Sequence, residues 1–163
     1  MKNLLIATLL VCFSNISFSQ GWSLVWEDDF SGTTLDQTIW THDLGTGSQY
    51  GLWGWGNGEL QFYQAGNTEV SNGTLKIVAK EEPGGLVDSW GNTMYYSSSK
   101  IKTENKFEVK YGKIEARIKT VNGEGFWPAF WMLPSGGSWP CDGEIDIMEQ
   151  WANDWPTVAT TGA

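Results

Sequence analysis

The sequence predicts an all-β sandwich. Its 163 residues contain no amphipathic helix of useful length. Short runs of alternating apolar and polar residues are instead separated by turn signals, a pattern typical of antiparallel sandwiches. The Asn72-Gly73 dipeptide between residues 68–70 and 74–80 is a strong hairpin signal of the same kind.

The expected elements of the first half follow in order. Residues 24–30 are predicted to be the first strand, and the hairpin around Asn72-Gly73 comes next. Residues 81–94 contain Pro83 and several glycines, so we expect a loop there.

Two strands are expected before the acidic segment described below. In residues 107–120 the apolar positions change from odd to even numbers at Gly112, which predicts a bulge or kink at this glycine. Residues 126–133 place Trp127 and Trp131 on one face of a strand.

The acidic segment 143–150 is the most informative part of the chain. Glu144, Asp146 and Glu149 fall within a stretch of six residues. The β-branched residues between them indicate that this stretch is a packed strand. Like charges on such a strand destabilise it, which favours a functional site over a structural role. Two carboxyl groups facing one bond are the machinery of glycoside hydrolysis. A solvated acidic strand is the alternative.

The spacing of these acids predicts a β-bulge. A regular strand would place Glu144 and Asp146 on one face and Glu149 on the other. An extra residue at Ile147-Met148 would return Glu149 to the face of the other two acids.

Residues 1–19 are predicted to be a secretory signal peptide. Lys2 gives the positive start, residues 4–13 an apolar core too short to span a membrane, and Ser17 and Ser19 a cleavage site. The mature domain would then be residues 20–163, secreted to the extracellular space or the periplasm, with no membrane anchor.

Composition excludes several classes of function. The net charge is −9 and Arg117 is the only arginine, which argues against nucleic-acid binding. His42 is the only histidine, which argues against both a Ser-His triad and a His-Cys metal cluster. Cys141 is the only cysteine beyond the signal peptide. The eleven tryptophans fill a core or offer flat apolar platforms, and loop positions such as Trp53 and Trp55 suit sugar rings.

Taken together, these residues resemble glycoside hydrolase family 16, and within it the bacterial laminarinases. The runs that carry the resemblance are residues 24–30, 53–61, 111–117, 127–134 and 143–149. The resemblance implies a concanavalin-like β-jelly-roll sandwich of two antiparallel sheets. Because few strand signals follow Glu149, we expect the sandwich to be incomplete at its C-terminus.

The resemblance also implies roles for the acids. Glu144 would be the nucleophile, Glu149 the general acid/base and Asp146 the helper between them, with no cofactor required for catalysis. In a retaining enzyme the two reacting carboxyl groups are about 5–5.5 Å apart.

Further site residues are implied in the same way. Trp127 and Trp131 would be aromatic residues of the cleft, although both could be core residues. Asn57 would bind sugar hydroxyls at the cleft edge or merely form a turn, and Glu59 is a further candidate. Lys100 stands where many laminarinases carry an arginine, and lysine offers a point charge in place of a planar fork. Asp29, with a carbonyl near Gly73, matches a structural calcium site of the family.

The resulting prediction is a secreted, monomeric, retaining endo-β-1,3-glucanase whose partner is a β-glucan such as laminarin. A mixed-linkage β-1,3-1,4-glucanase and a β-glucan-binding module without turnover are the alternatives. Anionic galactans are disfavoured because they require basic subsites, and this chain has only ten lysines and arginines.

Overall fold

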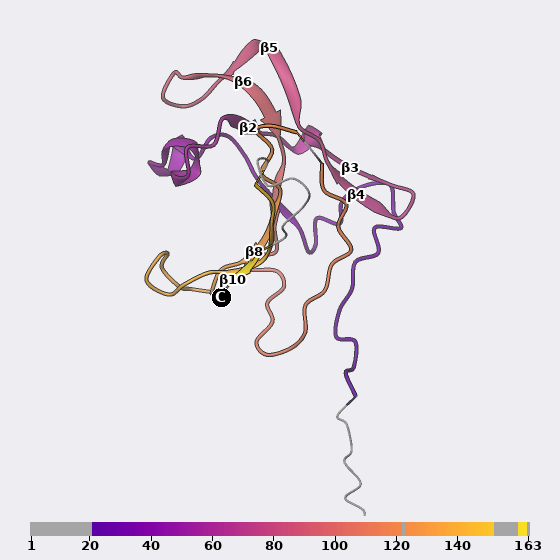
Figure 1. Ribbon diagram of the computed structural model, residues 1–163. Helices are drawn as coiled ribbons and strands as arrows, with labels where there is room; N and C mark the ends of the chain where they lie inside the picture. Colours follow the sequence, from indigo (N-terminus) through magenta and orange to yellow (C-terminus); the bar gives the residue numbers. More distant parts are fainter. Residues whose placement is uncertain (1–20, 122, 152–159, 163) are drawn as a thin grey trace, which may run out of the picture.

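The computed structural model describes residues 21–121, 123–151 and 160–162 (Figure 1). This part of the chain contains ten short strands and three single-turn 3-10 helices, which confirms the all-β prediction. The strands are β1 (Thr41–Asp43), β2 (Gln61–Tyr63), β3 (Thr68–Ser71), β4 (Thr74–Ile77), β5 (Lys80–Val87), β6 (Thr93–Ser98), β7 (Lys100–Lys102), β8 (Ala129–Met132), β9 (Ile145–Glu149) and β10 (Thr160–Gly162). The helices are η1 (Ser48–Tyr50), η2 (Trp53–Gly56) and η3 (Ala65–Asn67).

The strands form four small sheets. Two have three strands, in the orders β2-β6-β5 and β10-β9-β8, and two are the pairs β1-β7 and β3-β4. Every pairing is antiparallel except that of β2 with β6. In Figure 1 the β5-β6 hairpin lies at the top, β8 and β10 lie below it near the middle of the view, and β3 and β4 project to the right.

The hairpin predicted around Asn72-Gly73 is confirmed. β3 pairs with β4 from Thr68↔Ile77 to Ser71↔Thr74, leaving the two turn residues between them. Both have positive φ, 53° at Asn72 and 68° at Gly73, which is the left-handed conformation that a tight hairpin turn requires.

The loop predicted for residues 81–94 is wrong, because β5 and β6 form a hairpin there. The register shifts between Glu81 and Leu86, so the Pro83-Gly84-Gly85 sequence lies in an irregularity within β5 and does not end it. The true loop is residues 88–92. The Asp88 carboxylate holds it by accepting hydrogen bonds from the backbone N–H groups of Trp90 (2.9 Å) and Asn92 (2.8 Å).

The strands predicted at residues 24–30 and 107–120 are also wrong. Neither segment has a strand assignment, because alternation marks a potential strand but only a hydrogen-bonded neighbour makes one. Side chains hold them together instead, with the rings of Trp26 and Phe107 only 4.7 Å apart. The kink predicted at Gly112 is confirmed as a bend over residues 110–112, with φ of 68° at Tyr111.

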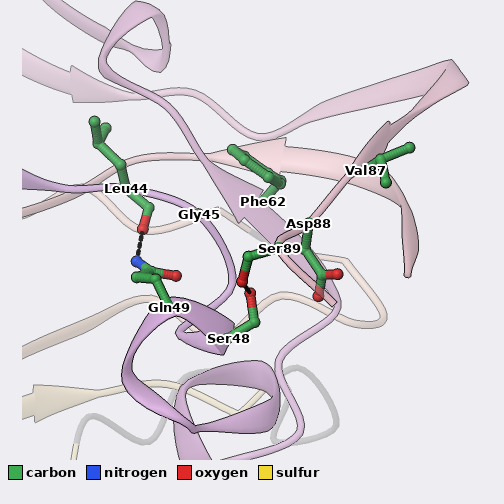
Figure 2. A pocket seen from close by; sticks show the side chains of 8 residues that line it. All are labelled: Leu44, Gly45, Ser48, Gln49, Phe62, Val87, Asp88 and Ser89. Atoms are coloured by element: carbon green, nitrogen blue, oxygen red, sulfur yellow. Dashed lines mark hydrogen bonds between the residues drawn. The ribbon is translucent and has the colours of Figure 1, made fainter. Parts of the chain in front are cut away.

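The apolar core of the described residues is small. Val70, Met94 and Met148 are its buried members, while Leu24, Val25 and Tyr111 are among many large apolar side chains that remain exposed. Figure 2 shows a pocket of about 340 Å³ between the 44–49 segment and the end of β5. It is lined by Leu44, Gly45, Ser48, Gln49, Phe62, Val87, Asp88 and Ser89. None of the three acids of the predicted site lines this pocket, so it is separate from the candidate active site.

Candidate active site

The predicted bulge in the acidic strand is present. β8 and β9 pair through Phe130↔Met148 and then Trp131↔Asp146, so one step on β8 matches two steps on β9. Ile147 is therefore the additional residue, at the position expected from the spacing of the acids.

This bulge gives Asp146 and Glu149 a common face. Asp146 lies opposite Trp131, and Glu149 lies opposite Ala129. Ala129 and Trp131 are two residues apart on β8 and so share a face, and their cross-strand partners share it with them. Glu144, two residues before Asp146, continues the same alternation just outside β9.

Two tryptophans donate hydrogen bonds to the outer acids of this group. The indole Nε1 of Trp139 donates to Glu144 Oε2 at 2.8 Å, and that of Trp127 donates to Glu149 Oε1 at 3.2 Å. Such bonds orient each carboxylate while leaving its second oxygen available. No hydrogen bond joins Asp146 to either glutamate, so the direct contact expected of a helper residue is not formed here.

The aromatic residues of this site are placed differently from one another. Trp127 is exposed and stacks on Trp151, with ring centroids 4.0 Å apart and planes 27° apart. Trp131 is half-buried beside the ammonium of Lys100, whose Nζ is 5.3 Å from the ring centroid. The Trp127 ring therefore offers surface to a ligand, whereas Trp131 also packs within the protein.

Lys100 connects the acidic strand to the rest of the site. Its Nζ lies 4.1 Å from the ring centroid of Trp55, a favourable cation–π distance. Burial lowers the pKa of Lys100, and the carboxylates of Asp43, Glu59 and Glu144 act in the opposite direction. A single cation therefore faces carboxylates from three separate segments of the chain.

Glu59 is the acceptor in a second cluster. Its carboxylate accepts hydrogen bonds from Tyr63 Oη (2.6 Å), Gln61 Nε2 (2.7 Å) and Asn57 Nδ2 (3.4 Å). Burial, and then the charge of Glu59, raise the pKa of Tyr63, so this phenol remains a neutral donor. Glu59 is thus half-buried and bonded, while Asn57 is exposed at the edge of the cluster.

The structure therefore brings together Glu59, Lys100, Trp131 and Glu144, which lie far apart in the sequence. Sequence reasoning missed Asp43 and Tyr63 in this group. Asp43 ends β1, a three-residue strand without a usable alternation signal, and nothing in the sequence marks it as a partner of Lys100.

The two segments of the predicted calcium site are adjacent, but only part of a coordination shell is visible. The backbone oxygen of Asp29 lies 3.7 Å from the position a Cβ would take on Gly73. The Asp29 side chain is hydrogen-bonded by Ser31, which lowers the pKa of this carboxyl. Within residues 21–121, 123–151 and 160–162 no group of three His, Cys, Asp or Glu side chains could hold a metal.

The arrangement as a whole suits acid–base and nucleophilic chemistry on a neutral ligand. Asp146 and Glu149 face one side of β9 with Glu144 just before the strand, indole N–H groups donate hydrogen bonds to the two glutamates, and aromatic surface is exposed beside them. No helix among the described residues has the length and hydropathy to cross a bilayer.

Comparison with known proteins agrees with this chemistry. Residues 56–162 match the family described as Glycosyl hydrolases family 16. The chain is 41% identical over 136 residues to Glucan endo-1,3-beta-glucosidase A1 of Niallia circulans, covering 79% of this chain and 20% of that protein. It is 39% identical to the Beta-glucanase of Rhodothermus marinus, covering 78% of this chain and 43% of that protein.

A solved structure gives the same result for the fold. The catalytic domain of an endo-1,3-beta-glucanase (laminarinase) from Thermotoga petrophila RKU-1 superposes with a TM-score of 0.77 at 47% identity. The match covers 82% of this chain and 53% of that domain, so this chain spans about half the length of the laminarinase. The likeness confirms the predicted jelly-roll class.

Proposed function

Because this chain belongs to glycosyl hydrolase family 16, we propose that it acts as a retaining endo-β-1,3-glucanase on laminarin-type β-glucans. The observation that carries this proposal is the bulge at Ile147, which gives Glu149 the same face as Asp146. Like charges gathered on one face of a strand repel one another and destabilise it, which favours a functional role for them.

In the proposed reaction, Glu144 attacks the anomeric carbon while Glu149 protonates the departing glycosidic oxygen. The C–O bond to the leaving chain breaks as a bond from the Glu144 carboxylate to the sugar forms. Glu149, now ionised, takes a proton from water, and that water displaces Glu144 with a second inversion. The product keeps the anomeric configuration of the substrate.

The remaining site residues have supporting roles in this proposal. Asp146 shares a face of β9 with Glu149 and lies between the two glutamates in sequence, where it would assist them in the reaction. Trp127 and Trp131 would stack against the apolar faces of glucosyl units, and Asn57, Glu59 and Lys100 would bind hydroxyl groups. Loss of laminarin affinity in Trp127→Ala, measured by calorimetry, would support the role of this exposed ring, and unchanged affinity would contradict it.

The choice of β-1,3-glucan is supported by the chain's acidity and by the relatives. A net charge of −9 suits a neutral polysaccharide better than a sulfated one. The Niallia protein is named a glucan endo-1,3-beta-glucosidase and the Thermotoga protein an endo-1,3-beta-glucanase.

A structural calcium ion would need ligands beyond those visible here. Asp29 and a carbonyl near Gly73 would supply some of the six to eight oxygens that calcium takes. Chelation with EDTA should then lower the melting temperature and added calcium restore it, while an unchanged melting temperature would contradict the proposal.

The cellular setting of the enzyme is also proposed. Residues 1–19, which lie outside the described residues, would direct secretion. Residues 20–163 would form part of the catalytic domain. N-terminal sequencing of secreted protein should begin near residue 20, and an N-terminus at Met1 would contradict the signal peptide. Gel filtration should give the mass of a monomer.

A substrate panel tests the proposed function. The full-length chain is incubated with laminarin, lichenan and agarose, and released reducing ends are measured, with Glu115→Gln as a control because Glu115 is exposed outside the site. Release from laminarin in preference to lichenan supports β-1,3 specificity. Preference for lichenan would favour a mixed-linkage enzyme, and binding of laminarin without release would favour a binding module.

A further inference from the structure

Asp43 holds two lysines at the edge of the site. It ends β1 and lies directly opposite Lys100 of β7. Its carboxylate is buried, with 8% of the side chain exposed, and Oδ1 is 2.8 Å from the Nζ of Lys102. Its other oxygen, Oδ2, is 3.9 Å from the Nζ of Lys100, too far for a direct hydrogen bond.

The two lysines differ in what else they contact. Lys102 also pairs with Glu104 at 2.7 Å, so its charge is compensated on both sides. The ammonium of Lys100 lies near the rings of Trp55 (4.1 Å) and Trp131 (5.3 Å). The charged groups facing it are those of Asp43, Glu59, Lys102 and Glu144.

We propose that Asp43 is a positioning residue, which holds the Lys100 ammonium between Trp55 and Trp131 so that its charge faces Glu144. The inference rests on the proposed function only in the role that it gives to Glu144. Asp43 itself would touch neither substrate nor the reacting atoms.

Two features of the geometry support this role. A lysine side chain has four rotatable bonds and a compact charge, so its position depends on what surrounds the ammonium. Asp43 supplies a fixed negative charge on one side, and the two indole rings limit movement on the others.

Lys102 explains why Asp43 does not simply cancel the charge of Lys100. With one carboxylate oxygen bonded to Lys102 at 2.8 Å, Asp43 attracts Lys100 only through the more distant oxygen. Part of the Lys100 field therefore remains available to the other carboxylates near it, which are Glu59 and, more weakly, Glu144.

The first test follows Lys100 directly. In the full-length protein, lysines are labelled with ¹³C-methyl groups and the Lys100 signal, assigned by its loss in Lys100→Met, is titrated. Asp43→Asn should lower the pKa of Lys100 further, because it removes the nearest opposing charge, whereas the control Glu69→Gln on exposed β3 should leave it unchanged. An unchanged titration in Asp43→Asn would overturn the proposal.

The second test uses activity on laminarin in a double-mutant cycle. Asp43→Asn should lower kcat about 10–100-fold, since misplacing a site group by about 1 Å can cost this much. If Asp43 acts through Lys100, adding Asp43→Asn to Lys100→Met should cause little further loss. Fully additive losses would show that Asp43 acts independently and would contradict the proposal.

Two controls separate the possible failures. Asp43→Glu keeps the charge and should keep the Lys100 titration near that of the wild type with intermediate activity, which covers the case in which Asp43→Asn does not fold. An equal loss in both variants would point to packing alone and overturn the proposal. A wild-type chain that does not hydrolyse laminarin would contradict the proposed function, while the titration would still decide the role of Asp43.

Discussion

Glu144 and Glu149 have separate roles in the proposed reaction, and their hydrogen-bond partners distinguish them. Each accepts a hydrogen bond from a different tryptophan, Trp139 at 2.8 Å and Trp127 at 3.2 Å. Their surroundings therefore differ although both belong to one acidic motif. Their assignment as nucleophile and acid/base comes from the family resemblance, and the hydrogen bonds are compatible with it.

A glutamine at position 149 tests this division of labour. Glu149→Gln should lower kcat on laminarin by about 10²–10⁴-fold, because neither proton transfer can occur. On a glucoside with a dinitrophenolate leaving group, added azide should recover much of the rate, since this leaving group needs no proton and azide needs no general base. Rates measured by dinitrophenolate absorbance check both statements.

The matched control is the same change at the neighbouring acid. Glu144→Gln should not recover with azide through a retained product, because the covalent step itself is lost. If Glu144→Gln and not Glu149→Gln recovers with retention, the two roles are reversed.

The strand of the acidic motif and its bulge could be predicted, because three carboxylates on an otherwise apolar strand are costly and their spacing required an additional residue. The partners of Lys100 could not be predicted from the sequence. Asp43 reaches it only because β1 and β7 pair, 57 positions apart in sequence between Asp43 and Lys100. Contacts that depend on which strands become neighbours leave no local trace in a sequence.

The bulge in β9 predicts how the strand responds when a single residue is deleted from it. Deleting Ile147 leaves Asp146 and Glu149 two residues apart, so regular alternation keeps all the acids on one face without a bulge. Deleting Ile145 makes Glu144 and Asp146 adjacent, so they face opposite sides. Laminarin hydrolysis should remain measurable in the first deletion and be abolished in the second.

The two deletions remove the same residue type from the same strand, so a general loss of stability would affect both. Melting temperatures for the pair provide the check on folding. Activity retained without Ile145 but lost without Ile147 would contradict the placement of the acids by alternation.

The β5-β6 hairpin gives a second prediction at this scale. Desolvation acts to raise the pKa of Asp88, but hydrogen bonds from Asn92, Thr46 and Trp90 outweigh it and the pKa is lowered. A carboxyl whose pKa is lower in the folded state stabilises the fold at pH values above its unfolded pKa, which is near 3.8. This contribution is lost as the pH falls through the folded pKa. Asp88→Asn should lower the melting temperature at neutral pH. Below about pH 4, the melting temperature of this variant should fall less steeply with pH than that of the wild type.

Thermal melts at pH 7, 4 and 3 check this prediction. Glu81→Gln is the control, because Glu81 is an exposed carboxyl of the same hairpin. A melting temperature of Asp88→Asn that falls as steeply in acid as that of the wild type would contradict the account.

A strand pair could be predicted where the residues of its turn determine the turn's conformation by themselves. The Asn72-Gly73 turn fixed one hairpin correctly, whereas Pro83 and the glycines beside it wrongly suggested a loop, because a bulge within β5 accommodates them. The segments at 24–30 and 107–120 contain the apolar residues typical of strands, alternating in the second segment, but neither has a paired neighbour in the described chain. Pairing is a property of the whole fold, so alternation alone could not reveal its absence.

At the scale of the whole molecule, the described residues expose much apolar surface. Trp22, Val25 and Tyr111 are 76%, 82% and 89% exposed, and Trp139 beside Glu144 is 62% exposed. Surface of this kind binds apolar ligands or partners. The dye ANS should therefore fluoresce strongly with this chain near neutral pH.

A laminarin oligosaccharide should displace only part of that dye. Rings at the site, such as Trp127 and Trp139, would be covered by the sugar, whereas Leu24, Val25 and Tyr111 belong to segments without a predicted sugar-binding residue. Complete displacement, or no dye binding at all, would contradict this distribution of apolar surface.

The measurement that tests the central claim most directly is the anomeric configuration of the first product. Proton NMR during early hydrolysis of laminarin by the full-length chain distinguishes the two anomers before mutarotation. The account predicts that the β-anomer appears first and that Glu144→Ala forms no product. An α-anomer appearing first, or hydrolysis undiminished in Glu144→Ala, would contradict the retaining mechanism and the role of Glu144.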